Sequence, residues 1–119
     1  MSLRIGFIGA GRMARTHAMC LADMDDVTIA SFTDILPERA QELAGWYDAA
    51  CHSDYHDMLE TDRLDAVYIC TPTGAHAEQC LAVARRGLPF FVEKPLTLTL
   101  AEGKQVCDAY GIPVPKEGV

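Results

Sequence analysis

The sequence predicts a single α/β domain in which strands and helices alternate around a doubly wound, mainly parallel sheet. Three observations support this prediction. Short apolar runs recur along the chain, helical patterns separate them, and a glycine-rich turn follows the first run. Continuous apolar runs are typical of parallel strands covered on both faces, and strand–helix alternation is typical of doubly wound folds. A length of 119 residues is enough for one such domain with a hydrophobic core.

The chain opens with a strand, a glycine turn, a helix and a second strand. Residues 4–8 form an apolar run, and Gly9-Ala10-Gly11-Arg12-Met13-Ala14 follows it. Apolar residues at helical spacing extend from Arg12 to about Met24. A second apolar run, 27–33, ends at Asp34. This order of elements predicts a Rossmann-type unit that binds a nicotinamide dinucleotide.

The glycine turn has a physical role at each position. Gly9 permits a tight turn, and Gly11 lets the backbone approach a pyrophosphate because it has no side chain. Ala14 is small enough for close packing of helix and strand. The positive end of the helix dipole would face the phosphates. Asp34 would accept hydrogen bonds from the adenosine ribose.

The acid at the strand end favours NAD over NADP, because the Asp34 carboxylate would repel a 2′-phosphate. Arg12 and Arg39 leave NADP open as an alternative, since either guanidinium could pair with that phosphate. An exposed arginine is more often simply solvated. The alternative is that the glycines only form a turn and bind no ligand. The strand before them, the helix after them and the acid at the end of the next strand all fit the dinucleotide-binding pattern and favour cofactor binding.

The rest of the chain continues the alternation. Pro37 suits the first turn of a second helix, and Trp46 and Tyr47 are expected to follow that helix and to pack. The buried stripe of this helix comprises Ala40, Leu43 and Ala44. The later patterns predict a helix over 55–60 capped by Ser53, a strand over 66–70, a helix over 75–86 ended by Gly87, and a strand over 89–92. Thr99 and Glu102 have the spacing of a capping box, whose helix runs to about Tyr110 before Gly111.

The composition argues against several classes of partner. The 10 Lys and Arg residues face 17 Asp and Glu residues, and the net charge of −7 argues against nucleic-acid binding. No apolar run is long enough to span a bilayer, and no signal peptide is visible. The cysteines form no CxxC pair and lie in apolar segments, which favours a reduced, cytoplasmic protein. They are Cys20, Cys51, Cys70, Cys80 and Cys107.

Two of the histidines have a spacing that is found in metal sites. His52 and His56 are four residues apart and are flanked by Cys51 and Asp57. That spacing suits a metal ion on a helix, but this segment reads as a strand end that runs into a helix cap. The two rings would then not share a face, so a metal site is disfavoured. His17 lies on the inner face of the first helix and is expected at the edge of the core.

Two further motifs follow strands at the edge where α/β folds bind ligands. Thr71-Pro72-Thr73, with His76 three residues later, follows the strand over 66–70. Glu93-Lys94-Pro95 follows the strand over 89–92. Each has a structural alternative: Glu93 and Lys94 could be a solvated charge pair, and packing or capping is favoured for His76 over chemistry.

Taken together, the motifs resemble those of the Gfo/Idh/MocA oxidoreductases, which include glucose–fructose oxidoreductase and inositol 2-dehydrogenase. The resemblance covers residues 4–111 and rests on the glycine turn, Asp34, Asp65-Ala66-Val67, the Thr-Pro-Thr motif with His76, and Glu93-Lys94-Pro95. It implies hydride transfer between NAD(P) and a sugar, cyclitol or other polyol. The implied cofactor contacts are Gly9, Ala10, Gly11, Arg12, Met13, Asp34, Thr71, Pro72, Thr73, His76, Glu93 and Lys94. The resemblance also implies that Lys94 contacts the substrate as the catalytic residue, aimed by a Pro95 that is often cis in the family.

The resemblance ends near residue 111. Proteins of the family continue into a second α/β domain that supplies most of the substrate pocket, whereas residues 112–119 form an atypical tail. Pro113 and Pro115 do not suit the sixth strand expected near Ile112. A naturally short form, a truncated reading frame and a cloned fragment all remain open.

The lack of a substrate domain in this sequence limits the functional prediction. The chain is expected to bind cofactor without turnover unless a second domain is supplied. A non-enzymatic NAD-binding module, completed in trans or acting as a sensor, is the main alternative, and a remnant that no longer binds nucleotide is another. Apolar surface left uncovered by the missing domain predicts a homo-oligomer.

Overall fold

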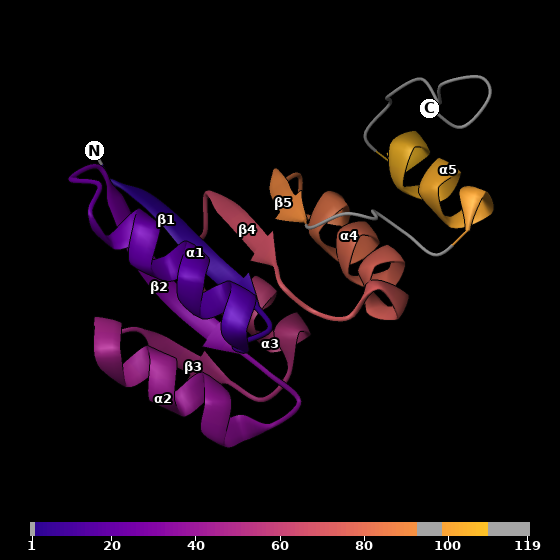
Figure 1. Ribbon diagram of the computed structural model, residues 1–119. Coiled ribbons are helices and arrows are strands. Elements are labelled where there is room, and N and C mark those ends of the chain that lie inside the picture. Colours follow the sequence, from indigo (N-terminus) through magenta and orange to yellow (C-terminus); the bar gives the residue numbers. More distant parts are fainter. Residues whose placement is uncertain (1, 93–98, 110–119) are drawn as a thin grey trace.

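The computed structural model describes residues 2–92 and 99–109, which form a five-stranded parallel sheet with helices on both faces (Figure 1). The strands are β1 (Leu3–Ile8), β2 (Val27–Thr33), β3 (Ala50–His52), β4 (Ala66–Ile69) and β5 (Phe90–Val92). Their order across the sheet is β3-β2-β1-β4-β5, and every neighbouring pair is parallel. This arrangement confirms the predicted Rossmann-type α/β domain.

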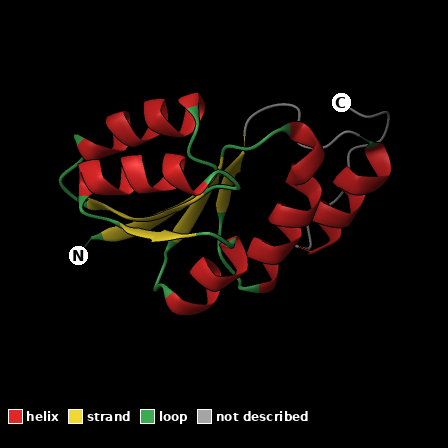
Figure 2. Cartoon of the chain, turned by 90° about the horizontal axis from the view of Figure 1, so that it is seen from below, coloured by secondary structure: helices red, strands yellow, loops and turns green. Residues whose placement is uncertain are grey.

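The helices divide between the two faces of the sheet. They are α1 (Arg12–Ala22), α2 (Pro37–Tyr47), α3 (Tyr55–Thr61), α4 (His76–Arg85) and α5 (Leu100–Ala109). Figure 2 shows α1 and α2 on one face and α3 and α4 on the other, with α5 beside α4. The chain reverses direction across the sheet between β1 and β4, and such a switch point is where open α/β sheets bind ligands.

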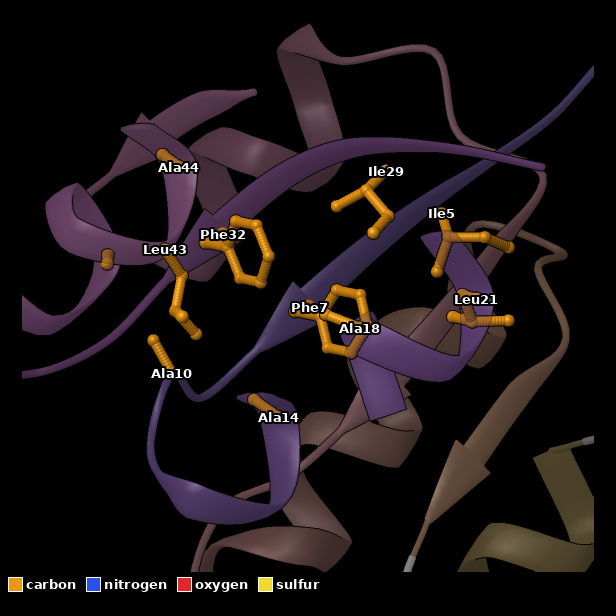
Figure 3. Packing of buried hydrophobic residues seen from close by; sticks show 11 residues of the cluster. Ile5, Phe7, Ala10, Ala14, Ala18, Leu21, Ile29, Phe32, Leu43 and Ala44 are labelled. Atoms are coloured by element: carbon orange, nitrogen blue, oxygen red, sulfur yellow. The ribbon is translucent and has the colours of Figure 1, made fainter. Parts of the chain in front are cut away.

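The core beneath α1 and α2 is built on rings that pair across neighbouring strands. Phe7 of β1 is fully buried, and its ring centroid lies 5.0 Å from that of Phe32 and 5.2 Å from that of Tyr68. Figure 3 shows Phe7 and Phe32 facing the small side chains of Ala14 and Ala18 on α1. These alanines let α1 approach the sheet closely, which places its first turn at the end of β1.

The opposite face has its own apolar cluster, to which α3, α4 and α5 contribute. Met58 and Cys80 are fully buried in it, and Val106 of α5 is 3% exposed. Two separate clusters, one on each face, explain why the strands read as continuous apolar runs. Within the described ranges, no helix is long and apolar enough to cross a bilayer.

Two predictions around the second helix need correction. Trp46 and Tyr47 are the last two residues of α2 and do not follow it, because the helix continues to Tyr47 and its C-cap residue, Asp48, adopts a left-handed conformation with φ of 53°. Tyr47 packs on Phe32 as expected, with ring centroids 6.1 Å apart. Trp46 is instead 49% exposed, and the Arg15 guanidinium lies 4.6 Å from its ring centroid.

The helix caps differ in how well the sequence predicted them. Asp54, and not Ser53, caps α3, since its Oδ1 accepts a hydrogen bond from the His56 N–H at 2.8 Å. The capping box of α5 is confirmed. There the Glu102 N–H donates to Thr99 Oγ1 and the Thr99 N–H donates to Glu102 Oε1, both at 3.2 Å.

Several element ends also differ from the prediction. The first helix ends at Ala22, before Met24, and a short 3-10 turn over Thr73–Ala75 delays α4 until His76. Cys20 and Cys51 are exposed and do not pack in apolar surroundings. The predicted end of the last helix at Tyr110 and the atypical tail 112–119 lie outside the described residues.

Candidate cofactor-binding site

The turn between β1 and α1 is held between two neighbouring strands. The Gly9 N–H donates to the Thr33 carbonyl of β2 at 2.7 Å, and the Cys70 N–H donates to the Ile8 carbonyl at 2.8 Å. Gly9 has a φ of +100°, and a β-carbon added there would lie 2.4 Å from the Cys70 carbonyl oxygen. Only glycine combines this backbone conformation with this close approach.

The N-terminus of α1 opens from that turn and is suited to an anion. Gly11 is the N-cap residue, no side chain caps the helix, and the first turn contains no acid. A β-carbon added to Gly11 would meet Arg39 Nη1 at 3.8 Å as its nearest neighbour. The backbone is therefore open to a ligand, and the helix dipole favours a negatively charged one.

Asp34 lies at the end of β2 and connects the glycine turn to the next loop. Its Oδ2 accepts a hydrogen bond from the Ala10 N–H at 2.8 Å, and its Oδ1 accepts one from the Leu36 N–H at 2.8 Å. The carboxylate thus braces the turn, and carboxylate oxygens have further lone pairs for ribose hydroxyls.

Buried polar groups on α4 hold the Thr71-Pro72 loop from below. His76 is 1% exposed, and its Nε2 lies 2.8 Å from the Thr71 carbonyl oxygen. The Thr71 hydroxyl donates to Oε1 of Gln79, a side chain that is 8% exposed. Both contacts fix the loop after β4 against α4, so the structure places His76 beneath the loop and not at the open site.

A cavity of about 510 Å³ lies between the glycine turn, the end of β2 and the Thr71-Pro72 loop. Among its lining residues are four of the predicted cofactor contacts, Gly9, Asp34, Thr71 and Pro72. The lining also contains residues that no sequence motif marked, among them Ile35, Tyr55 and Gln79. Ile35 directly follows the predicted acid and is 93% exposed, so it offers an apolar surface at the cavity mouth.

Tyr55 contributes a polar tip to this cavity. Its hydroxyl donates to Glu78 Oε1 at 2.9 Å. Burial, together with this hydrogen bond and the nearby Glu78 charge, raises the pKa of Tyr55 above its ordinary value. The phenol therefore stays protonated at neutral pH and acts as a hydrogen-bond donor.

A second cavity, also of about 510 Å³, adjoins the first on the side of α1 and α2. Three residues of the glycine turn, Ala10, Gly11 and Arg12, line it. Arg39 lines both cavities.

Not all predicted contacts reach these cavities. Met13 is 42% exposed on α1 and lines neither, and Thr73 lies in the 3-10 turn that follows Pro72. Glu93, Lys94 and Pro95 lie outside the described residues.

The remaining histidines have structural partners. The Nε2 of His52 lies 2.9 Å from Asp62 Oδ2, so this ring pairs with a carboxylate. His17 packs edge-on against Phe91, with ring centroids 4.9 Å apart. In the part of the chain that the structure describes, no group of three or more His, Cys, Asp or Glu residues could hold a metal ion.

Comparison with known proteins places this geometry among oxidoreductases. A family model described as "Oxidoreductase family, NAD-binding Rossmann fold" matches residues 3–111. The chain is 37% identical over 108 residues to an inositol 2-dehydrogenase of Rhizobium meliloti (strain 1021), covering 90% of this chain and 32% of that relative. It is 35% identical over 101 residues to a myo-inositol 2-dehydrogenase of Thermotoga maritima, covering 84% of this chain and 30% of that relative.

A solved structure agrees with the sequence matches. The WlbA dehydrogenase from Bordetella pertussis, determined in complex with NADH and UDP-GlcNAcA, superposes with a TM-score of 0.86 and 30% identity. The match covers 94% of this chain and 36% of that one. The chain thus spans about a third of the length of the relatives it matches.

Proposed function

Because the chain belongs to the Gfo/Idh/MocA oxidoreductase family and is its NAD-binding Rossmann domain, we propose that the cavity at the glycine turn binds NAD(H) for hydride transfer to and from a polyol. The cavity between Gly9, Asp34 and the Thr71-Pro72 loop carries this proposal. It lies beside the open N-terminus of α1 and contains a carboxylate at the end of the neighbouring strand, and a dinucleotide requires both features.

The residues present fit the parts of the cofactor. The diphosphate would lie at Gly11, where a missing side chain leaves the backbone accessible. Asp34 would accept hydrogen bonds from the adenosine ribose. Ile35 and Pro72 would contact the adenine ring, since both line the cavity and Ile35 is 93% exposed. NAD is the expected form because the Asp34 carboxylate repels a 2′-phosphate.

The bound dinucleotide would supply the redox chemistry, with hydride leaving or joining its nicotinamide ring. The chain's own residues would bind and orient it, and the buried His76 and Gln79 contacts would keep the Thr71 loop in place. The family resemblance supports Lys94 as the group that contacts a substrate oxygen, and Glu93 as a neighbour of the nicotinamide ribose. An ammonium at that position would stabilise developing alkoxide charge.

A cyclitol or related polyol is the proposed substrate class, because the two sequence relatives described above carry the name inositol 2-dehydrogenase. These relatives are about three times as long as this chain. We therefore expect the chain to bind cofactor alone and to turn over substrate only with a second domain. A cytoplasmic location and self-association stay predictions of the sequence.

Titration of the full 119-residue chain with NADH tests the proposal. Trp46 is the single tryptophan, so energy transfer from its ring to the nicotinamide provides a direct signal beside calorimetry. Saturable binding of one NADH per chain supports the proposal. Absence of binding by both methods would overturn it. Steady-state formation of NADH from NAD and myo-inositol by this chain alone would contradict the expected lack of turnover.

A further inference from the structure

Helix α1 carries charged residues of opposite sign at its two ends. Arg12 and Arg15 are exposed in its first turn, and no acid accompanies them there. Asp23 is the C-cap residue, and two further exposed acids, Asp25 and Asp26, follow it before β2. The macrodipole of a helix is positive at its N-terminus and negative at its C-terminus. Both groups of charges therefore lie at the end of α1 where a single chain stabilises them least.

These charges are not paired inside the part of the chain that the structure describes. Within residues 2–92 and 99–109, neither arginine and none of the three aspartates forms an ion pair. The Arg15 guanidinium instead lies 4.6 Å from the centroid of the Trp46 ring. At the basic end, Arg39 of α2 adds a third guanidinium beside the second cavity, where Glu42 is the one acid among the described lining residues. Both ends of α1 are therefore available to charges on another molecule.

The exposed side of α1 is arranged symmetrically about Met19. Arg15 precedes Met19 by four residues and Asp23 follows it by four, while Arg12 and Asp26 are each seven residues away. Helix residues three or four apart are neighbours on one face. Arg12, Arg15, Met19 and Asp23 therefore form one exposed row, which we call the α1 ridge. Met19 is 58% exposed, so the ridge has an apolar centre between a basic end and an acidic end.

From this arrangement we propose that the α1 ridge binds the same ridge of a second copy of this chain, with the two helices antiparallel about a two-fold axis at Met19. Arg15 of each copy then faces Asp23 of the other, and Arg12 faces Asp26. The two Met19 side chains meet at the axis. A two-fold interface uses one surface twice, so it requires a surface that is complementary to itself. The α1 ridge meets this requirement.

Charge complementarity favours a second copy over other partners. A nucleic acid matches the basic end alone, and the net charge of −7 opposes its approach. A second copy satisfies both ends, and it also places the Asp23 carboxylate near the positive end of the facing helix. The α1 ridge differs from the uncovered apolar surface that the sequence suggested for self-association. Dimerisation through the ridge does not depend on cofactor binding, so the two can be tested separately.

The contact is small, which sets the expected affinity. The 11 residues of α1 extend about 16 Å. The buried area therefore falls at the low end for specific interfaces, and we expect a dissociation constant in the micromolar range. Sedimentation equilibrium of the full 119-residue chain measures it. Because salt screens exposed ion pairs, raising the NaCl concentration from about 0.05 M to about 0.5 M should weaken dimerisation at least about tenfold.

Charge reversal identifies the surface that dimerises. Arg15→Asp and Asp23→Arg should each weaken dimerisation at least about tenfold, because two attractive contacts become repulsive. An equimolar mixture of the two variants should associate about as tightly as the unmodified chain, since the reversed residues face each other in the mixed dimer. Arg85→Asp on α4 and Asp108→Arg on α5 are the matched controls. They change the net charge equally at exposed positions on other helices and should leave dimerisation unchanged.

A chain that stays monomeric up to about 1 mM would overturn the proposed dimer. A dimer whose strength neither variant changes would also overturn it. A mixture of the two variants that stays monomeric would show that Arg15 and Asp23 do not face each other, with the same consequence. Arg12 stays unchanged in all samples because it is an expected cofactor contact. The substituted side chains are exposed, and thermal unfolding checks that each variant folds. Loss of NADH binding with an intact dimer would overturn the proposed function alone.

Discussion

The Ala10 main-chain N–H donates a hydrogen bond of 2.8 Å to Asp34 Oδ2. The contact joins the glycine turn to the end of the neighbouring strand, 24 residues further along the chain. A residue expected to serve only the cofactor thus also fixes the loop that must approach the phosphates. In the proposed complex the same carboxylate would both bind the cofactor and stabilise the turn, so binding and local stability would be coupled at this position.

Replacing Asp34 should lower stability and affinity together. Asp34→Ala removes the acceptor for both Ala10 and Leu36, and we expect the free energy of unfolding to fall by about 2 kcal/mol. Asp34→Asn keeps one carbonyl oxygen as an acceptor, so we expect it to lower the free energy of unfolding by only about half as much. NADH affinity should drop at least about tenfold in both variants. Urea unfolding measures the change in stability, and NADH titration measures the change in affinity. An Asp34→Ala variant of unchanged stability would show that the hydrogen bonds to Ala10 and Leu36 do not stabilise the fold.

Replacing Gly9 at the turn should destabilise the chain much more than replacing Gly45 in α2. Gly9→Ala places a β-carbon 2.4 Å from the Cys70 carbonyl oxygen at a φ of +100°, so we expect a loss of more than about 2 kcal/mol. Gly45→Ala is the matched control. No atom lies within 4 Å of its added β-carbon, and α2 should gain about 0.5–1 kcal/mol. Denaturant unfolding measures the stability of both variants. Equal changes in the free energy of unfolding would contradict the prediction.

The features that the sequence predicted well are local ones. The glycine turn, Asp34 and the capping box of Thr99 and Glu102 depend on spacing within a short segment, so a pattern reveals them. The three-residue strand β3 was anticipated only as a strand end, because its residues are partly or fully exposed and form no apolar run.

The features that the sequence did not predict depend on the packing of distant elements. Gln79 reaches the cavity only because α4 lies under the loop at Thr71, and the sequence between them gives no sign of that contact. The row of rings from Phe91 through Tyr68 and Phe7 to Phe32 follows from strand register, which pairs these residues across β5, β4, β1 and β2. The second cavity, lined by residues of both helices, likewise requires α1 and α2 to pack side by side.

A double-mutant cycle should reveal the hydrogen bond between Thr71 and Gln79. Thr71→Val leaves the Gln79 carbonyl oxygen without this donor in a buried site, and a cost of about 1–3 kcal/mol is expected. Gln79→Leu should cost a similar amount. The double variant should lose less than the sum, since both partners are then apolar. Additive losses in urea unfolding would mean that the two side chains are not coupled.

Alkaline pH should destabilise the chain through Cys80. This thiol is fully buried on α4, and burial raises its pKa from 9.0 to about 12. Between these values the unfolded chain releases the thiol proton while the folded chain keeps it, so stability falls as pH rises from about 9 and levels off above about 12. The slope contributed by Cys80 is at most about 1.4 kcal/mol per pH unit.

The pKa values of Tyr55 and Tyr68 are also raised, so these tyrosines add to the loss of stability at alkaline pH. A substitution at Cys80 separates the contribution of the thiol from theirs. Cys80→Ala should lower stability at pH 7, because it leaves a cavity in the core, and should flatten the decline above pH 9. Cys20→Ala, at an exposed cysteine, is the control and should keep the decline of the unmodified chain. Urea unfolding at pH 7 and pH 10 measures the difference. Equal declines in the two variants would show that Cys80 does not ionise on unfolding, which would contradict its burial as the cause.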